Sequence, residues 1–170
     1  MIKNFKIVLR QGYILRSLRK TDKAITEQEL SDRISEIQKH LKPATIYDTL
    51  APALFKKSEE FGKAVAISLF AVTLGEEVES LEKTEILSVS LKDGLEAAKT
   101  FVLKLIQLEA EEEHCEILEP VEVGPEVIFE NKKILSKIDF AKIGIKFESG
   151  ILKPENTKFM LAGWLVKKRK

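Results

Sequence analysis

The chain has 170 residues, of which 44 % are hydrophobic and 32 % charged, so it has apolar side chains enough for one domain and too few residues for two independent ones. The formal net charge of +1, from 28 basic and 27 acidic residues, excludes the global positive field that drives nucleic-acid binding. Lys outnumbers Arg by 23 to 5 and Glu outnumbers Asp by 22 to 5, a skew typical of proteins from thermophiles.

Cysteine usage and the N-terminus predict a compartment. Cys115 is the single cysteine, which excludes an internal disulfide and fits a reducing environment. The first residues reach charged side chains too early to supply the apolar core of a secretory signal. We therefore expect a soluble cytoplasmic protein, with residues 1–170 forming one domain in which residues 1–43 are an N-terminal helical part.

Two elements are expected before Pro43. Residues 4–18 leave two alternatives open, a short strand with alternating apolar residues or a basic, half-amphipathic helix over residues 9–18. Thr26 and Glu29 have the spacing of a capping box, which predicts a helix start. Apolar residues then recur on one helical face until Pro43 ends the pattern, at Leu30, Ile34, Ile37 and Leu41.

Residues 64–75 are the central feature of the sequence, a nearly unbroken apolar run closed by Thr73, Leu74 and Gly75. The run is too short to cross a bilayer as a helix, which takes about 20 residues. Its Val, Ile, Phe and Ala content predicts a strand buried on both faces, the central strand of an α+β domain. Before it, residues 44–50 suggest a short extended segment and residues 54–61 a helical turn or two.

A short helix reaching Lys83 is expected after Gly75, because acidic residues favour a helix first turn. A longer helix is expected from about Thr84 into residues 109–113. Its apolar face comprises Leu91, Leu95, Ala98, Val102 and Leu105.

The C-terminal third predicts mostly strands and turns. Residues 116–123 indicate a strand or extended loop, and the Gly124-Pro125 dipeptide indicates a turn. Residues 131–138 indicate a short helix. Alternating apolar residues over 143–147 and the apolar run 159–166 predict a hairpin with a long connection over residues 149–157. The basic end, residues 167–170, is expected to be solvated.

Two local patterns could carry chemistry, and each has a simpler explanation. Gly75 at the end of a strand has the form of a phosphate cradle, but the glutamates that follow it favour an ordinary buried strand and capped helix. Residues 111–116 place Glu, His and Cys together, with Glu111 and His114 at a helical metal-ligand spacing; a solvated helix end is favoured over a metal site.

Cys115 is expected to be a small buried apolar group rather than a nucleophile, and no Ser-His-Asp grouping can be assembled. A basic N-terminal segment is the best candidate for a surface that contacts a polyanion or an acidic partner, although it lacks the interleaved aromatic residues that stack on nucleic-acid bases. Its residues are Lys3, Lys6, Arg10, Arg16, Arg19, Lys20 and Lys23.

Four segments follow the motif order of a known family. Residues 9–13 are similar to a Leu-Arg-x-x-Gly-Tyr signature, shorter by one residue. Residues 29–50 are similar to a helix followed by a Pro- and Tyr-containing segment, which here is residues 42–47. Residues 71–77 match an apolar strand that ends in Thr-Leu-Gly-x-Glu, the closest local match. Residues 143–157 are similar to Ile-Gly-Val followed by Glu-Ser-x-Met-Met-x-Pro-x-Lys-Ser.

In this order, the segments resemble the activation (reactivation) domain of cobalamin-dependent methionine synthase, in a stand-alone form. The resemblance implies an α+β fold with a twisted, mostly antiparallel sheet and flanking helices. It also implies docking on a corrinoid-binding module, and S-adenosylmethionine binding in support of cobalamin reduction and remethylation. Carried over by motif, docking would involve Glu148, Ser149, Lys153, Pro154 and Tyr13.

The departures from the family fall on the cofactor-binding motifs. The family's Arg-Pro-x-x-Gly-Tyr-Pro loop corresponds to a segment that keeps Pro120, Gly124 and Pro125 but has Glu119 in place of the arginine and lacks the tyrosine. Such a charge reversal opposes binding of the cofactor's carboxylate. The Leu-Asp-x-x-Gly signature is altered around Asp93, and Phe159 and Met160 replace a Ser-Gly pair.

We therefore expect an accessory protein that docks in trans on a cobalamin-dependent methionine synthase or another corrinoid protein. We expect S-adenosylmethionine binding to be weak or absent at the altered motifs, which comprise Glu119, Pro120, Gly124, Pro125 and Asp93. The chain would contact cobalamin only through the partner protein. A non-catalytic role is favoured over an enzyme. Two alternatives stay open, an interaction module unrelated to cobalamin and an S-adenosylmethionine-binding or metal enzyme.

Overall fold

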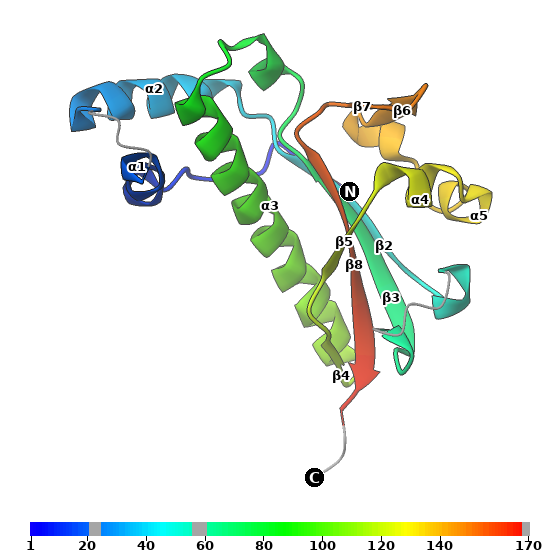
Figure 1. Ribbon diagram of the computed structural model, residues 1–170. Helices are drawn as coiled ribbons and strands as arrows, with labels where there is room; N and C mark the ends of the chain where they lie inside the picture. The colour runs from blue at the N-terminus through cyan, green and yellow to red at the C-terminus, as the bar shows by residue number, and fades with distance from the viewer. Residues whose placement is uncertain (21–24, 56–60, 168–170) are drawn as a thin grey trace.

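The protein is described from a computed structural model that covers residues 1–20, 25–55 and 61–167. It has an α+β architecture in which a curled antiparallel sheet lies between two groups of helices (Figure 1). The strand order is β1-β2-β3-β8-β4, and β5 also pairs with β8. The strands are β1 (Ile2–Lys3), β2 (Ala44–Leu50), β3 (Ala66–Thr73), β4 (Cys115–Ile117), β5 (Val121–Val123) and β8 (Thr157–Val166).

The central strand is confirmed, because β3 pairs with β2 on one side and β8 on the other and is buried over nearly its whole length. Successive side chains point to opposite faces of a strand. Phe70 and Val72 accordingly pack in the core under the long helix, whereas Leu69 and Ala71 pack in the core on the opposite face. Two covered faces explain why the sequence run is apolar without alternation.

Three longer helices cover the first face: α1 (Gln11–Arg19), α2 (Glu27–His40) and α3 (Glu85–Glu112). The capping prediction for α2 is confirmed, since Thr26 Oγ1 accepts a hydrogen bond of 3.2 Å from the Glu29 amide. Thr84 caps α3 in the same way through the Leu87 amide. Of the two alternatives at the N-terminus, the helix is the one observed, and the strand there is limited to β1.

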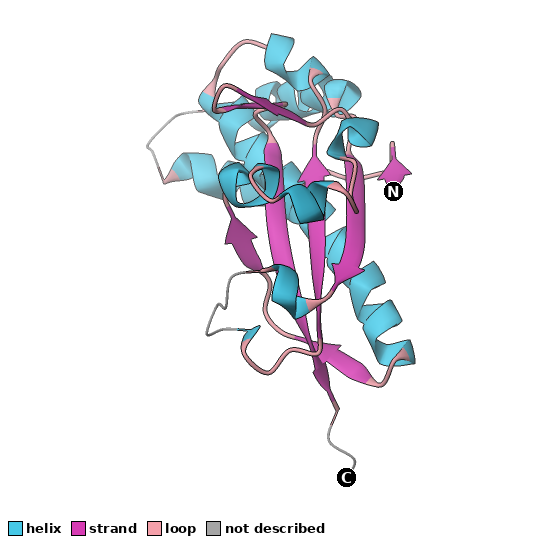
Figure 2. Ribbon diagram, turned by 90° about the vertical axis from the view of Figure 1, so that its right-hand side faces the viewer, coloured by secondary structure: helices cyan, strands magenta, loops and turns pink. Residues whose placement is uncertain are grey.

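Short elements cover the second face: η1 (Pro52–Leu54), α4 (Pro125–Phe129), α5 (Lys132–Leu135) and η4 (Phe140–Ile143). Figure 2, which looks onto this side, shows short helices over the upper part of the sheet. Gly124 is the N-cap of α4 rather than part of a free turn. After Gly75, the predicted short α-helix is instead a single turn of 3-10 helix, η3 (Glu77–Ser80).

The predicted C-terminal hairpin is wrong. A separate two-stranded sheet pairs β6 (Lys146–Glu148) with β7 (Ile151–Lys153), and β8 instead pairs with β3 in the main sheet. Ser149 and Gly150 have φ values of 51° and 77°, which close a tight turn seven residues before β8 begins at Thr157. The predicted extended segment 116–123 is likewise divided into β4 and β5.

Three sequence predictions concern residues outside the described part of the chain. These are the contribution of Lys23 to the basic segment, most of the helical turn expected over residues 54–61, and the solvated end at residues 168–170.

Candidate functional site

Three loops that are distant in sequence meet at the upper end of the sheet. The Leu74 amide donates a hydrogen bond of 3.1 Å to the Asn156 carbonyl, and the Lys42 amide donates one of 2.9 Å to the Leu74 carbonyl. The Glu155 amide donates a bond of 2.6 Å to Glu79 Oε1. The residue that follows Leu74, Gly75, therefore lies at a junction of the segments 42–47, 71–77 and 148–157.

Gly75 is required at this junction for two physical reasons. Its φ of +86° lies in the left-handed region that L side chains rarely adopt. A Cβ atom there would lie 2.9 Å from Lys42 Cβ and 3.1 Å from the Lys42 carbonyl oxygen. The backbone of the corner can approach the Lys42 segment this closely because no side chain intervenes.

We expect Gly75→Ala to destabilise the protein by more than the roughly 1–2 kcal/mol that the left-handed conformation alone costs. Gly150→Ala is the matched control, because Gly150 has a φ of +77° and no heavy atom within 4 Å of an added Cβ. Urea titration measures how much unfolding free energy each variant loses relative to the wild type. The difference between the two losses isolates the cost of the close approach to Lys42. Equal losses in both variants would show that the contact with Lys42 relaxes without cost.

A groove of about 430 Å³ lies beside this junction, between η3 and the first turns of α3. Its floor is apolar, whereas its rim has charges of both signs. The floor residues are Val78, Leu81, Leu87, Leu91 and Leu95, and the charged rim residues are Glu79, Lys83, Lys92 and Glu155.

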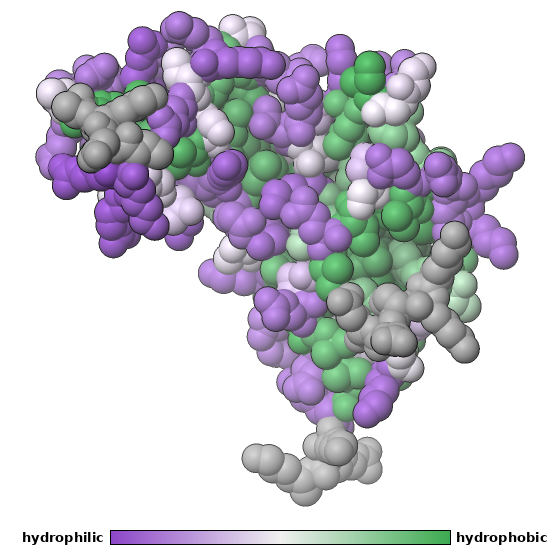
Figure 3. Space-filling view, viewed as in Figure 1, coloured by the Kyte–Doolittle hydropathy of each residue, from purple (hydrophilic) through white to green (hydrophobic). Residues whose placement is uncertain are grey.

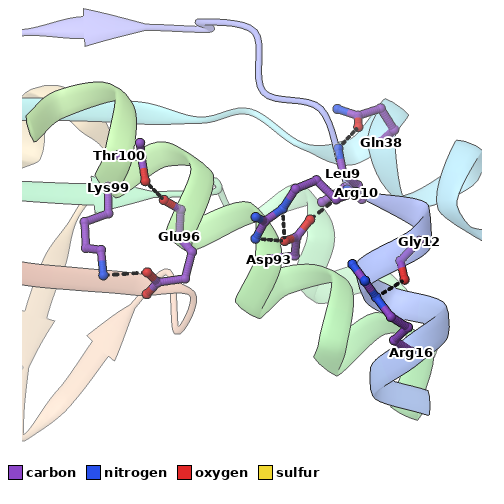
Figure 4. Close-up of polar contacts among 9 residues, drawn as sticks. All are labelled: Leu9, Arg10, Gly12, Arg16, Gln38, Asp93, Glu96, Lys99 and Thr100. Atoms are coloured by element: carbon purple, nitrogen blue, oxygen red, sulfur yellow. Dashed lines mark hydrogen bonds and ion pairs between the residues drawn. The ribbon is translucent and has the colours of Figure 1, made fainter. Parts of the chain in front are cut away.

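An ion pair between Arg10 and Asp93 joins the N-terminal segment to α3 (Figure 4). Asp93 Oδ2 accepts a bond of 2.7 Å from the Arg10 amide, and Oδ1 accepts from Nε at 2.8 Å and Nη2 at 2.5 Å. The Asp93 side chain is fully buried, while that of Arg10 is 61 % exposed. The hydrogen bond with Asp93 raises the pKa of Arg10, which stays charged.

Farther along α3, a second set of charges reaches β5. Glu96 contacts Lys99 at 2.5 Å and Lys158 at 3.6 Å, and Lys158 contacts Glu122 at 2.9 Å. Burial disfavours the charged form of Glu96, but the two lysines outweigh it and lower its pKa. The hydrogen bond to Glu122 raises the pKa of Lys158. These contacts link the helix that carries Asp93 to β5, within the segment for which the resemblance implies a cofactor loop.

The predicted cofactor-binding residues lie on three elements. Glu119 and Pro120 are in the loop between β4 and β5, Gly124 and Pro125 begin α4, and Asp93 is on α3. Both carboxylate oxygens of Asp93 already accept hydrogen bonds from Arg10. A cofactor group that approached Asp93 would compete with that arginine.

The predicted docking residues are not brought together. Glu148 and Ser149 lie at the β6–β7 turn, exposed Lys153 ends β7, and Pro154, which is buried, follows it. Tyr13 lies on α1, which Figure 1 shows across the molecule from β6 and β7, with α3 between them. The docking prediction therefore describes two separate surfaces.

Two further contacts were not indicated by any local pattern. Tyr47 on β2 donates a hydrogen bond of 2.6 Å to Glu109 Oε1 on α3. Burial, together with this bond, raises the pKa of Tyr47 to about 12. Arg10 and Asp93 are 83 residues apart in sequence, and their pairing likewise needs the fold.

A larger hollow of about 700 Å³ lies on the second face, near η1, α4 and α5. Its apolar lining includes Phe55, Phe61 and Leu161, and Figure 3 shows hydrophobic side chains on this side of the molecule. Its rim has Glu126, Glu130, Lys132 and Lys133, so the rim charges balance one another.

Within residues 1–20, 25–55 and 61–167, no group of three His, Cys, Asp or Glu side chains could hold a metal ion. Cys115 is buried, as expected, and contacts the Glu113 carbonyl at 3.5 Å, whereas His114 is exposed. No described helix has both the length and the apolar character needed to cross a membrane.

A scan against models of protein families found no match for the chain, and a search of curated proteins found none either.

Proposed function

We propose that this protein is an accessory protein for the reactivation of a cobalamin-dependent methionine synthase, acting by docking in trans on the corrinoid-binding module. The proposal rests on the resemblance of four segments to the family's activation domain. Its function comes from the contacts that the protein makes with the partner enzyme, and no residue of the chain is assigned a bond-making role.

The observation that carries the proposal is the meeting of these segments in space. Residues 42–47, 71–77 and 148–157 are joined by the backbone hydrogen bonds of Leu74 with Lys42 and with Asn156. Residues 9–13 are attached to α3 through Arg10 and Asp93, within the altered Leu-Asp-x-x-Gly signature. Three of the four segments are therefore adjacent in the fold, and this adjacency supports the resemblance over chance similarity.

The site's charges support weak or absent S-adenosylmethionine binding. Glu119 is exposed in the loop where the resemblance implies an arginine, so a carboxylate there meets a like charge. Asp93 is engaged by Arg10, and Glu122 is engaged by Lys158. A ligand that needed these carboxylates would first have to break their ion pairs.

The proposal is tested by adding the protein to a methionine synthase that lacks its own activation domain, with the enzyme in the cob(II)alamin form. We expect co-elution of the two proteins and a change in the cofactor's absorption spectrum in the presence of a reductant and S-adenosylmethionine. An unchanged spectrum together with separate elution would overturn the proposed function.

Isothermal titration calorimetry tests the cofactor claim separately. We expect no saturable heat for the protein alone with S-adenosylmethionine up to about 1 mM, equivalent to binding weaker than about −4 kcal/mol. Saturation well below that concentration would show that the altered loop still binds the cofactor. The Glu119→Arg variant is the matched comparison, since it restores the charge found in the family and should bind more tightly.

A further inference from the structure

The N-terminal arm, defined as residues 1–20, differs in charge from the rest of the surface. It contains six Lys and Arg residues and no Asp or Glu, although the whole chain is nearly neutral. All six basic side chains belong to exposed residues. They are Lys3, Lys6, Arg10, Arg16, Arg19 and Lys20.

The β6–β7 hairpin, the other surface carrying predicted docking residues, lacks such an excess. Its strands contain Lys146, Glu148 and Lys153, and Glu155 lies two residues after Lys153. Exposed charges of opposite sign largely cancel at such short range. Of these two surfaces, the arm is therefore the one whose charge can select an acidic partner.

The arm also presents a pair of side chains that is ordered before any partner arrives. Asp93 holds the Arg10 guanidinium by two hydrogen bonds, and that group lies 4.9 Å from the centre of the Tyr13 ring. Tyr13 is 42 % exposed, and Val8, in the same arm, is 64 % exposed. Arg and Tyr dominate the binding energy of many protein interfaces, and side chains held in place lose less entropy on binding.

The neighbouring elements do not remove the positive charge. Asp93 is buried and neutralises only Arg10. Glu27 of α2 lies near the arm, since the Gln11 side chain reaches the Glu27 carbonyl at 3.5 Å. Arg16 follows Tyr13 by three residues, about one helical turn, on α1. Its Nε donates a hydrogen bond to the Gly12 carbonyl (Figure 4), and no carboxylate within residues 1–20, 25–55 and 61–167 forms an ion pair with it.

Other classes of partner fit the arm less well. The apolar face of α1 is occupied, because Ile14 and Leu18 are buried against the protein at 0 % and 2 % exposure and cannot enter a lipid surface. Tyr13 is the arm's single exposed aromatic residue, whereas nucleic-acid surfaces place several aromatic rings for base stacking. A folded protein surface that combines carboxylates with apolar side chains matches both the charges of the arm and its exposed Val8 and Tyr13.

We propose that the N-terminal arm, rather than the β6–β7 hairpin, docks the protein onto an acidic surface of the corrinoid-binding module. The inference rests on the proposed function and assigns its docking contact to Tyr13, Arg16 and Val8. Arg10 is a positioning residue that fixes the Tyr13 ring.

The test measures the Kd for an isolated corrinoid-binding module by calorimetry for the wild type and three surface variants. We expect Tyr13→Ala and Arg16→Glu each to weaken binding by about tenfold or more, and the control Lys153→Glu, a charge reversal on the hairpin, by less than about twofold. Wild-type binding should also weaken as salt rises, less steeply in Arg16→Glu. Far-ultraviolet circular dichroism and the unfolding midpoint verify that the variants fold.

The outcomes separate the two claims. Absence of wild-type binding overturns the proposed function, and this inference with it. Binding that survives both arm substitutions, or that is lost in Lys153→Glu alone, overturns the inference and leaves the proposed function standing. Wild-type binding to a single-stranded oligonucleotide or to phosphatidylserine vesicles that is tighter than to the module, and is lost in Arg16→Glu, also overturns it.

Discussion

The Asp93→Ala variant is expected to lose about 2–3 kcal/mol of unfolding free energy, because hydrogen bonds to a charged buried acceptor contribute about 1.5–3 kcal/mol each and are not fully additive. The substitution removes the acceptor of three bonds from Arg10 and leaves the Arg10 amide without its partner. Urea unfolding followed by the fluorescence of Trp164, the single tryptophan, measures the loss.

The Arg10→Ala variant and the double variant complete this test. Arg10→Ala leaves a fully buried carboxylate without its counter-charge, which is costly in its own right. We therefore expect the double variant to be less destabilised than the sum of the two single variants. Strict additivity would show that the two side chains stabilise the fold independently, and that the arm is held to α3 by its apolar contacts alone.

Phe159→Ala is expected to have a larger effect, a loss of about 3–5 kcal/mol typical of removing a buried aromatic ring. Phe159 is 1 % exposed on β8 and meets Phe129 of α4 and Phe140 of η4 edge to face, with centroid distances of 5.8 Å and 5.4 Å. Removing the ring therefore leaves a cavity and loosens the attachment of both short helices to the sheet.

Phe147→Ala is the control for Phe159→Ala, because Phe147 is only partly buried and contacts Phe129 from the small β6–β7 sheet at 5.3 Å. Its loss should be clearly smaller in the same urea titration. Losses of equal size would contradict the central position of Phe159 in this cluster. A loss below about 1 kcal/mol in Phe159→Ala would show that the cavity collapses.

The surroundings of Phe159 explain why β8 has bulky apolar residues at this point. The resemblance implies a Ser-Gly pair where this chain has Phe159 and Met160, and both residues are buried in opposite cores of the sheet. At this point β8 is paired with both β3 and β5, so the side chains contribute to packing. The change therefore fits a segment that supports the fold rather than one that contacts a ligand.

Local patterns in the sequence predicted the elements that local physics determines. The capping residues Thr26 and Thr84 start α2 and α3, and the doubly buried β3 was recognisable because its apolar run needs cover on both faces. The α+β class follows from these elements. The β6–β7 turn was missed because Ser149, with its positive φ, is a weak turn signal beside the proline-containing loop that follows.

The sequence by itself determined the central strand within residues 64–75, the helix capped by Thr26, the long helix from about Thr84, the balanced net charge and the basic N-terminal segment, since each depends on neighbouring residues alone. Only the tertiary structure decided that Lys42 lies against Gly75, that Arg10 pairs with Asp93, and that Tyr13 lies apart from the hairpin. The physical reason is that buried ion pairs and close backbone approaches depend on the packing of distant segments, for which a single sequence contains no local signal.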